Sequence, residues 1–476
     1  MIKKIFIVII FSVSIYAQNE NPIIAIGDSL VGKVINGESI RELHGNVILT
    51  QGKVRITCDK AIQYLAKNEA ELIGKVVVTQ DSIEVKTSKG KYFGNTQIAF
   101  SDAGINLTDG HVKLKSKKGY YYFEEKRSYF FDNVTLEEGI TKLFTDKLNY
   151  YDNDDKAIAV GNVVVQDTAS VLLADSLIYL RQTKFTDAYN NIRLYNSTNN
   201  ISLFCDRLND DGIKKISTIW GTPLLLRIEK TEDKADTLVV SSIKMEAYND
   251  STNNKLIAKE NVRINQNMFS SINSNTVFYQ NNDSIEIIKQ EEDTNPPIIW
   301  YDNAQLIGDS IYIYIKNKRL KEIQLKNNSS IISENENYNF RYDQISGKRI
   351  NIYFGNDNIE LTEVFRNVLS IYYVFDDGKK NGLIKSSSET ARIYFQDKEV
   401  SDVKLFGKPQ SEYFPENIIE GKEKEFTIPT FKIYENRPSK DELLSIRKNI
   451  LFYLEKDKKY NVTKSQLKKW TLNKDL

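Results

Sequence analysis

A period of 29 residues runs through the first half of the chain and restricts its possible folds more than any other feature. Aliphatic residues recur six times at this spacing, and a second aliphatic row follows two positions later in every unit. The two rows are Val47, Val76, Ile105, Val134, Val163, Ile192 and Leu49, Val78, Leu107, Leu136, Val165, Leu194. Such self-similarity is typical of stacked repeats, in which each unit buries its apolar face against its neighbours.

Within a unit, apolar and polar residues alternate, as they do in a strand with one buried face. Two further rows keep the same register: Ile56, Val85, Leu114, Leu143, Leu172 and Tyr92, Tyr121, Tyr150, Tyr179. The composition agrees, because 27 Tyr and 22 Phe stand against only 8 Pro, and aromatic residues favour strands. The sequence therefore predicts an all-β protein made of stacked repeats.

Each unit begins with a small or turn-forming residue: Gly45, Gly74, Ala103, Asp132, Gly161 and Asn190. Asn follows in four of the six units, as Asn46, Asn133, Asn162 and Asn191. Gly and Asn tolerate positive φ better than other residues, so these positions suit a bend or bulge in each strand.

A row of small residues lies eleven positions after the first aliphatic row: Cys58, Thr87, Ser116, Thr145 and Ala174. Asp follows the small residue at Asp59, Asp146, Asp175 and Asp206. This row could form a carboxylate ladder or bind calcium. The Gly-rich nonapeptide of calcium-binding β-rolls is missing, however, so we expect these side chains to cap turns.

The two cysteines test the stacked model. Cys58 and Cys205 occupy matching places five units apart. Two strand layers per unit, at roughly 4.8 Å each, would separate them by about 48 Å, far beyond the roughly 7 Å that a disulfide spans. We therefore predict two free, buried cysteines.

The first 17 residues have the pattern of a secretory signal peptide. Lys3 and Lys4 precede an apolar run at 5–15, and Ala17 offers a small residue for cleavage. The run is too short to span a bilayer of about 30 Å as a helix. A retained N-terminal anchor is the alternative, whereas no Cys follows the run to carry a lipid.

The chain divides into four segments by pattern: a signal peptide (1–17), a repeat domain (18–215), a less regular second β domain (216–415) and a tail (416–476). The period loosens after about residue 215. In the tail, Ser439 and Glu442 form a capping box. The apolar residues Leu443, Ile446, Ile450 and Leu454 then follow at helical spacing, which predicts one helix before a solvated, lysine-rich end.

No catalytic or metal-binding pattern stands out. The only histidines are His44 and His111, and no cysteine cluster accompanies either, so we predict no zinc site. Phosphate loops and nucleophile elbows are absent from the sequence. A formal net charge of +1 does not favour nucleic acid. We expect no cofactor and no enzyme, although a β-helical polysaccharide-acting enzyme or a surface adhesin remains the alternative class.

Taken together, the unit of Gly-Asn-Val, an apolar strand, a small residue with Asp and an aromatic resembles the OstA-like repeats of the LptA-type lipopolysaccharide transport family. The resemblance covers roughly residues 40–410. The blocks at 300–309 and 342–348 are similar to longer OstA-like proteins of Bacteroidetes. The third unit departs from the pattern, with Ala103 in place of Gly and Lys117 in place of Asp.

The resemblance implies a β-jelly roll opened into a V, often called a β-taco, and two such domains in succession. It also implies a periplasmic protein, at or near the outer membrane, that binds lipopolysaccharide acyl chains between its sheets. The partners it implies are lipopolysaccharide and other jelly-roll Lpt-type proteins. Because stacked strands leave open edges, we expect head-to-tail contacts by β-augmentation.

We hypothesise that paired aliphatic and small rows line the lipid path. These residues are Ile56, Cys58, Val85, Thr87, Leu114, Ser116, Leu143, Thr145, Leu172 and Ala174. The alternative role for each row is an ordinary packed core.

Overall fold

The computed structural model describes residues 22–457, apart from 231–234, 251, 281–282, 318, 336–337, 339, 356–357 and 398. The signal peptide predicted at 1–17 and the lysine-rich end beyond Asp457 lie outside these residues. The chain divides into two compact units, Met1–Gly139 with Asp146–Asn153 and Ile140–Thr145 with Asp154–Leu476. Each unit is described by itself.

The first unit is built almost entirely of strands. They are β1 (Ile24–Ile26), β2 (Ser29–Ile35), β3 (Glu38–Gln51), β4 (Val54–Tyr64), β5 (Glu69–Gln80), β6 (Ile83–Phe93), β7 (Ile98–Ser101), β8 (Ile105–Thr108), β9 (Val112–Ser116), β10 (Lys118–Tyr122) and β11 (Arg127–Glu138). A 3₁₀ turn, η1 (Leu65–Lys67), joins β4 to β5, and β12 (Thr141–Tyr151) is shared between the units.

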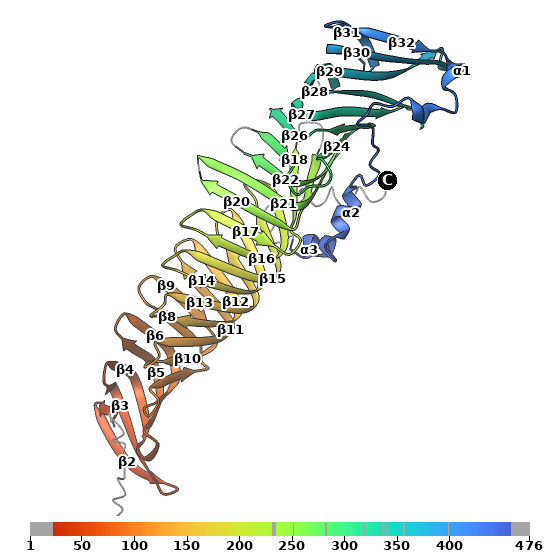
Figure 1. Ribbon diagram of the computed structural model, residues 1–476. Helices are drawn as coiled ribbons and strands as arrows, with labels where there is room; N and C mark the ends of the chain where they lie inside the picture. The colour runs from red at the N-terminus through yellow and green to blue at the C-terminus, as the bar shows by residue number, and fades with distance from the viewer. Residues whose placement is uncertain are drawn as a thin grey trace, which may run out of the picture. The chain divides into compact units, whose positions relative to one another are not determined.

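The second unit continues with strands and ends in short helices (Figure 1). Its strands are β13 (Lys156–Gln166), β14 (Ser170–Leu180), β15 (Phe185–Asn196), β16 (Ile201–Asp211), β17 (Ile216–Trp220), β18 (Leu224–Lys230), β19 (Ala235–Ser241), β20 (Lys244–Asp250), β21 (Asn253–Gln266), β22 (Phe269–Tyr279), β23 (Ser284–Ile288), β24 (Ile298–Tyr301), β25 (Ala304–Ile307), β26 (Ser310–Lys316), β27 (Arg319–Glu334), β28 (Tyr342–Gly355), β29 (Asn358–Asp376), β30 (Lys379–Gln396), β31 (Glu399–Phe406) and β32 (Gln410–Phe414). Its helices are α1 (Glu416–Ile419), the 3₁₀ turn η2 (Glu423–Glu425), α2 (Lys440–Ser445) and α3 (Ile450–Lys456).

Neighbouring strands within each unit lie side by side as antiparallel rungs, which Figure 1 shows as a ladder of arrows. The predicted all-β, jelly-roll-like class is confirmed. Pairing also crosses residue 215, because β16 pairs with both β17 and β18. The domain boundary placed there stays a prediction.

Most long strands bend at a two-residue corner, where the pairing register shifts. Between β3 and β4 the shift falls between His44 and Val47, and the intervening Gly45 and Asn46 have φ of 72° and 44°. The same double positive φ recurs at 74–75, 132–133, 161–162, 190–191, 260–261, 327–328 and 366–367. The bends predicted from the Gly and Asn positions are therefore confirmed, and they continue well past residue 215.

The third 29-residue repeat, which lies within the first compact unit, lacks this corner. Of Ala103 and Gly104, only Gly104 has a positive φ, at 83°. The chain breaks here into the short strands β7 and β8, and β9 and β10 are likewise separated at Lys117. An alanine is sterically disfavoured at positive φ, so the departure in sequence coincides with an interrupted rung.

Strand pairing places the aliphatic rows side by side. In the first unit one continuous column of paired residues is formed by Ile56, Val78, Val85, Leu107, Leu114 and Leu136. All six are buried, whereas residues between them in the strands, such as Arg55, Lys86 and Lys115, are exposed. We call the side that carries these buried columns the inner face, and the opposite side the outer face.

A C-terminal strap, residues 415–457, covers part of the outer face within the second unit. Leu443, Ile450 and Leu454 pack against outer-face residues Val171, Leu173, Tyr195, Phe204, Leu224, Leu226 and Val239. Side-chain amides hold the strap backbone: Gln305 donates to the Lys432 carbonyl at 2.7 Å and accepts from the Tyr434 amide at 2.9 Å. Gln344 accepts from the Ile428 amide at 2.9 Å.

The predicted terminal helix forms as two short ones. The capping box of Ser439 and Glu442 is present at the start of α2, and Leu443, Ile450 and Leu454 are buried as expected. Asn449 has φ of 65°, which a continuous α-helix does not allow. No helix of the described residues is long and apolar enough to cross a bilayer.

Candidate functional site

In the first unit the inner face is closely packed. Ile56, Val85 and Leu114 are all buried. The Tyr92 hydroxyl donates to Gln51 Oε1 at 2.6 Å, and the Tyr150 hydroxyl donates to Asp109 Oδ2 at 3.1 Å. Each corner divides its strand into two arms, and these two bonds join residues on opposite arms. One interior cavity in this unit has a volume of about 20 Å³ and is lined largely by apolar side chains.

The small residues of this unit form hydrogen bonds next to the corners. Cys58 Sγ donates to the Lys60 carbonyl at 3.2 Å, Thr87 Oγ1 to Lys89 at 3.0 Å, and Ser116 Oγ to Lys118 at 3.0 Å. Each side chain thus bonds the backbone two residues further on, next to the bend. Cys58 and Ser116 are buried and Thr87 is half-buried. This row therefore borders the interior, and its side chains also donate hydrogen bonds to backbone carbonyls at the corners.

Part of the inner face of the second unit is more exposed. Leu143, Thr145 and Ala174 are buried, and Thr145 Oγ1 donates to the carbonyls of Val160 and Gly161, each at 3.0 Å. By contrast, Leu172 is only half-buried.

Leu172 is paired with Val165 on one side and Leu194 on the other, and both are also half-buried. These three residues, which we call the open trio, form a partly exposed apolar strip on β13, β14 and β15. Val165 and Leu194 were absent from the predicted site. Their signal was available in the second aliphatic row, whose members in the first unit are buried.

A buried polar group interrupts the inner face further along the second unit. Asn273 Nδ2 donates to Ser271 Oγ at 3.1 Å, and Thr276 Oγ1 donates to Asn273 Oδ1 at 2.7 Å. Ser271 Oγ in turn donates to the Ile298 carbonyl at 2.9 Å. Ser271 pairs with Ile264 on one side and Ile299 on the other. We call Ser271, Asn273 and Thr276 the polar belt, because they separate two aliphatic stretches.

Beyond the polar belt the inner face is a fully packed core. Side chains with no exposed surface there include Ile287, Ile299, Ile311, Ile323, Leu325, Ile350, Val364 and Ala391. Such packing leaves no place for a guest chain without displacing side chains.

Aspartates accept hydrogen bonds at several corners. Asn46 Nδ2 donates to Asp28 at 2.9 Å, and Asn191 Nδ2 donates to Asp175 at 2.7 Å. Asp206 accepts from Arg447 of the strap at 2.7 Å. The capping role expected of Asp175 is confirmed.

The two cysteines are free and buried, as predicted. Burial raises the pKa of the Cys58 thiol to about 11 and that of Cys205 to about 12. Both therefore stay protonated at neutral pH and behave as small core residues.

Within the described residues, no group of three or more His, Cys, Asp or Glu side chains could hold a metal ion. His44 Nε2 lies 3.5 Å from Glu42, and His111 is exposed. The absence of catalytic residues, metal and cofactor stays a prediction from the sequence.

Comparison with known proteins finds a family model that matches part of the chain. The model for OstA-like proteins matches residues 23–110 and 140–250. Among solved structures, the chain is similar to LptH from Pseudomonas aeruginosa, described as the LptA-homologous periplasmic component of the conserved lipopolysaccharide transport device. The identity is 15%, over 30% of this chain and 85% of LptH, with a TM-score of 0.16. No curated protein matches the sequence. The resemblance to OstA-like repeats inferred from the sequence is therefore confirmed over these two ranges, which together make up less than half of the chain.

Proposed function

We propose that this protein is a periplasmic, non-catalytic carrier that holds lipopolysaccharide acyl chains against its inner face and passes them toward the outer membrane. The OstA-like match supports a transport role, and the signal-peptide pattern at 1–17 supports export. The single observation that carries the proposal is the open trio of Val165, Leu172 and Leu194.

The open trio supplies what an acyl chain needs. Its three side chains are apolar, adjacent across three strands and partly exposed on the inner face of the second unit. Burying exposed apolar surface yields about 25 cal/mol per Å², so a guest chain that covers the trio gains free energy. In the first unit the same rows are already buried. Their role there is therefore chiefly structural when no lipid is bound.

We place the far end of the lipid path at the polar belt. An acyl chain passing Asn273 would have to replace its hydrogen bonds with apolar contact, at a cost of about 1–3 kcal/mol per buried group left unpaired. The packed core beyond the belt offers no compensating space. The region after β22 therefore serves as a docking module in this proposal.

Each unit has edge strands that suit docking to other jelly rolls. In the described residues β1 and β2 pair only with β3, and they expose Ile24, Ile26 and Val34 at 60%, 62% and 73%. In the described part of the second unit β31 and β32 pair only with β30, and Val403 and Phe406 are exposed. Open apolar edge strands favour addition of a further strand, which supports head-to-tail contacts.

Photo-crosslinking tests the lipid path. A photoreactive residue at position 172 or 194 should capture lipopolysaccharide in the native envelope, because both side chains belong to the open trio. Position 213 is the matched control, since Ile213 is apolar and 63% exposed but lies in a turn. Positions 85, 114 and 143 should capture lipid only if the closed rows open during transport. Equal capture at 213, or none at 172 and 194, would overturn the proposal.

Sedimentation tests the docking edges. The protein should associate with a second jelly-roll protein, or with its own copies, as concentration rises. Replacing both Ile24 and Val34 with Lys should abolish that association, because charged side chains protect exposed edges. A strictly monomeric species at all concentrations that binds no jelly-roll partner would contradict head-to-tail docking.

A further inference from the structure

The outward side of helix α3 exposes two large apolar side chains. Leu451 and Phe452 are 41% and 58% exposed, whereas Ile450 and Leu454 on the inward side are buried against the sheet. The inward side chains already hold the helix on the second unit, so the outward pair is not needed for that packing. An adjacent Leu and Phe therefore form an apolar surface that is free to meet a partner.

The charges around this pair are arranged by the same division of the helix. On the outward side, the Lys456 ammonium lies 5.8 Å from the centre of the Phe452 ring. Of the two acids at this end of the strap, Glu455 is exposed. Asp457 is turned inward, with only 3% of its side chain exposed, and it pairs with Arg193 at 2.6 Å. The inward acid is thus neutralised within the second unit.

The end of the sequence carries a charge that the rest of the chain does not. Residues 447–476 contain nine Lys or Arg against three Asp or Glu, a net charge of +6. The whole chain has a formal net charge of +1, so residues 1–446 carry −5. Apolar residues stand among the lysines that follow α3: Tyr460, Val462, Leu467, Trp470 and Leu472. Positive charge and apolar side chains are therefore concentrated in the same thirty residues.

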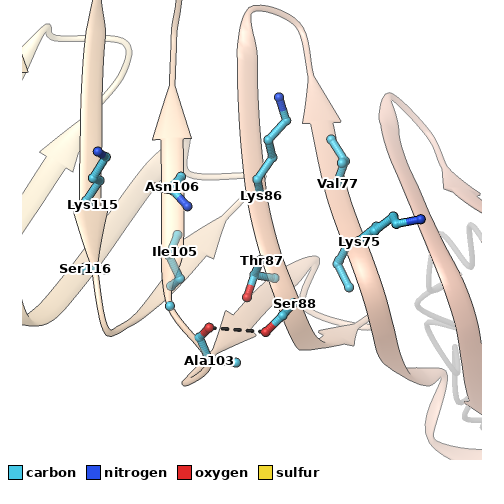
Figure 2. A pocket seen from close by; sticks show the side chains of 12 residues that line it. Lys75, Val77, Lys86, Thr87, Ser88, Ala103, Ile105, Asn106, Lys115 and Ser116 are labelled. Carbon is cyan, nitrogen blue, oxygen red and sulfur yellow. Dashed lines mark hydrogen bonds between the residues drawn. The ribbon is translucent and has the colours of Figure 1, made fainter.

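Lysines of the first unit are arranged differently. Figure 2 shows Lys86 and Lys115 on separate strands, β6 and β9. Lys86 lies 2.6 Å from Glu84, and Lys53 lies 3.8 Å from Asp81. The aliphatic residues next to Lys86 and Lys115 in their strands are buried. These lysines thus have partly neutralised charge and no exposed apolar neighbour in the strand, which makes them a matched control surface.

We propose that α3 and the basic residues after it bind the surface of a bilayer that contains anionic lipid. Leu451 and Phe452 enter the boundary between headgroups and acyl chains, and the lysines lie against the lipid phosphates. Apolar side chains and a polybasic segment act together on membranes, because either contribution alone gives only weak attachment. The inference goes beyond the proposed function, since it concerns an intact bilayer and does not depend on acyl-chain binding at the open trio.

A bilayer fits these residues better than a nucleic acid does. Lysines alone would bind the phosphates of a nucleic acid, and Leu451 and Phe452 would stay exposed to water. A bilayer surface accepts both the charged and the apolar side chains. Tyr and Trp, present here as Tyr460 and Trp470, are moreover the aromatic residues that favour membrane interfaces.

Vesicle co-sedimentation of residues 18–476 tests the charged part of this surface. The vesicles consist of phosphatidylcholine alone or of an equal mixture with phosphatidylglycerol. The charge variant replaces six lysines with Gln: Lys458, Lys459, Lys464, Lys468, Lys469 and Lys474. Its control replaces six exposed lysines of the first unit in the same way: Lys53, Lys86, Lys89, Lys113, Lys115 and Lys117. Both proteins then have the same net charge.

A second pair of variants tests the apolar part. Leu451→Ser with Phe452→Ser removes the exposed apolar pair of α3. The control is Ile213→Ser with Ile243→Ser, because these two residues are 63% and 46% exposed in the same unit. All four side chains are exposed, so thermal unfolding of both variants should match that of the wild type.

The wild type should bind the mixed vesicles more strongly than phosphatidylcholine, and added salt should weaken that binding. The charge variant should bind the mixed vesicles at least about tenfold more weakly, because one lysine at an anionic surface contributes up to about fivefold. The apolar variant should also lose about tenfold, through hydrocarbon that is no longer buried. Both controls should bind like the wild type.

Three results would overturn the proposal. The first is equal binding of the wild type to both kinds of vesicle. The second is an equal loss in the charge variant and its control, which would indicate a response to net charge alone. The third is unchanged vesicle binding by the apolar variant, which would indicate a site for any polyanion, and duplex DNA would then compete with the vesicles. Capture of lipopolysaccharide at positions 172 and 194 is a separate measurement, so these results leave the proposed function intact.

Discussion

The open trio and the packed core beyond the polar belt belong to the same unit and have the same strand architecture, yet their interiors differ. Val165, Leu172 and Leu194 are half-buried, whereas Ile299, Ile323 and Ile350 have no exposed surface. Both sections carry aliphatic residues on the inner face. Room for a guest is therefore set by how the inner side chains fill the space, and strand pairing does not determine it.

Truncating one residue in each section gives the largest expected contrast. Ile350→Ala should lower the free energy of unfolding by about 2–5 kcal/mol, because it leaves a cavity in a packed core. Leu172→Ala should cost less than about 1.5 kcal/mol, since its side chain is already partly hydrated. Urea denaturation measures both, with Ile213→Ala as the exposed control. Equal costs at 350 and 172 would show that the trio is packed in solution.

The polar belt should depend on its hydrogen bonds. Asn273→Ala leaves Ser271 and Thr276 without their Asn273 partner and should destabilise the second unit by about 1–3 kcal/mol. Adding Thr276→Val should cost little more, because the orphaned hydroxyl is then gone. A double-mutant cycle measures this coupling. Additive losses would mean that the belt is not a connected network.

The strap gives a smaller, local effect. Asp457 Oδ2 accepts from Arg193 at 2.6 Å and from the Tyr195 hydroxyl at 2.9 Å. Asp457→Ala removes both bonds and should destabilise α3 locally by about 1–2 kcal/mol. Hydrogen exchange of the α3 amides should then accelerate, while exchange in β27 and β28 stays slow. Faster exchange throughout the second unit would show that the strap stabilises the packed core as well.

The smallest contrast concerns pH. Burial alone would raise the pKa of Glu246, but Lys244 and Lys259 together lower it from 4.5 to about 2. Its stabilisation is therefore present above pH 4.5 and lost as pH falls toward 2. Burial raises the pKa of Asp343 from 3.8 to about 6, against the Tyr373 amide that lowers it. Here stability falls as pH rises from 3.8 through 6.

Two variants separate these opposite slopes. Glu246→Gln should remove the acid-side loss near β20, and Asp343→Asn should remove the decline between pH 3.8 and 6, each by on the order of 1 kcal/mol. Thermal unfolding from strongly acidic to mildly alkaline pH measures both. A wild-type slope that persists in Asp343→Asn would assign the decline to another group.

Periodicity in the sequence was enough to predict the rungs and the corners. Gly45 and Asn46 are compatible with positive φ in a way that most residues are not, so a bend at each unit follows from local chemistry. The column from Ile56 to Leu136 follows from the same register, because alternate residues of a strand share one face. The prediction that Cys58 and Cys205 are free followed from their expected separation along the stack.

Other features needed the tertiary structure. The row from Ile56 to Ala174 could be a packed core or a lipid path by pattern alone, and its members turn out to differ in exposure along the chain. The strap could not be foreseen, because the residues that bind it, such as Gln305 and Gln344, are far from it in sequence and carry no periodic signal.

The sequence by itself determined a stacked, all-β architecture with bends at fixed positions, because backbone propensity and alternation are local properties that repeat every 29 residues. Only the tertiary structure decided where that stack is closed by Tyr–Gln and Tyr–Asp bonds, where it is partly open at Leu172, and where the polar belt interrupts it. Those features depend on which side chains meet across strands and arms, and such meetings are set by packing over long sequence separations.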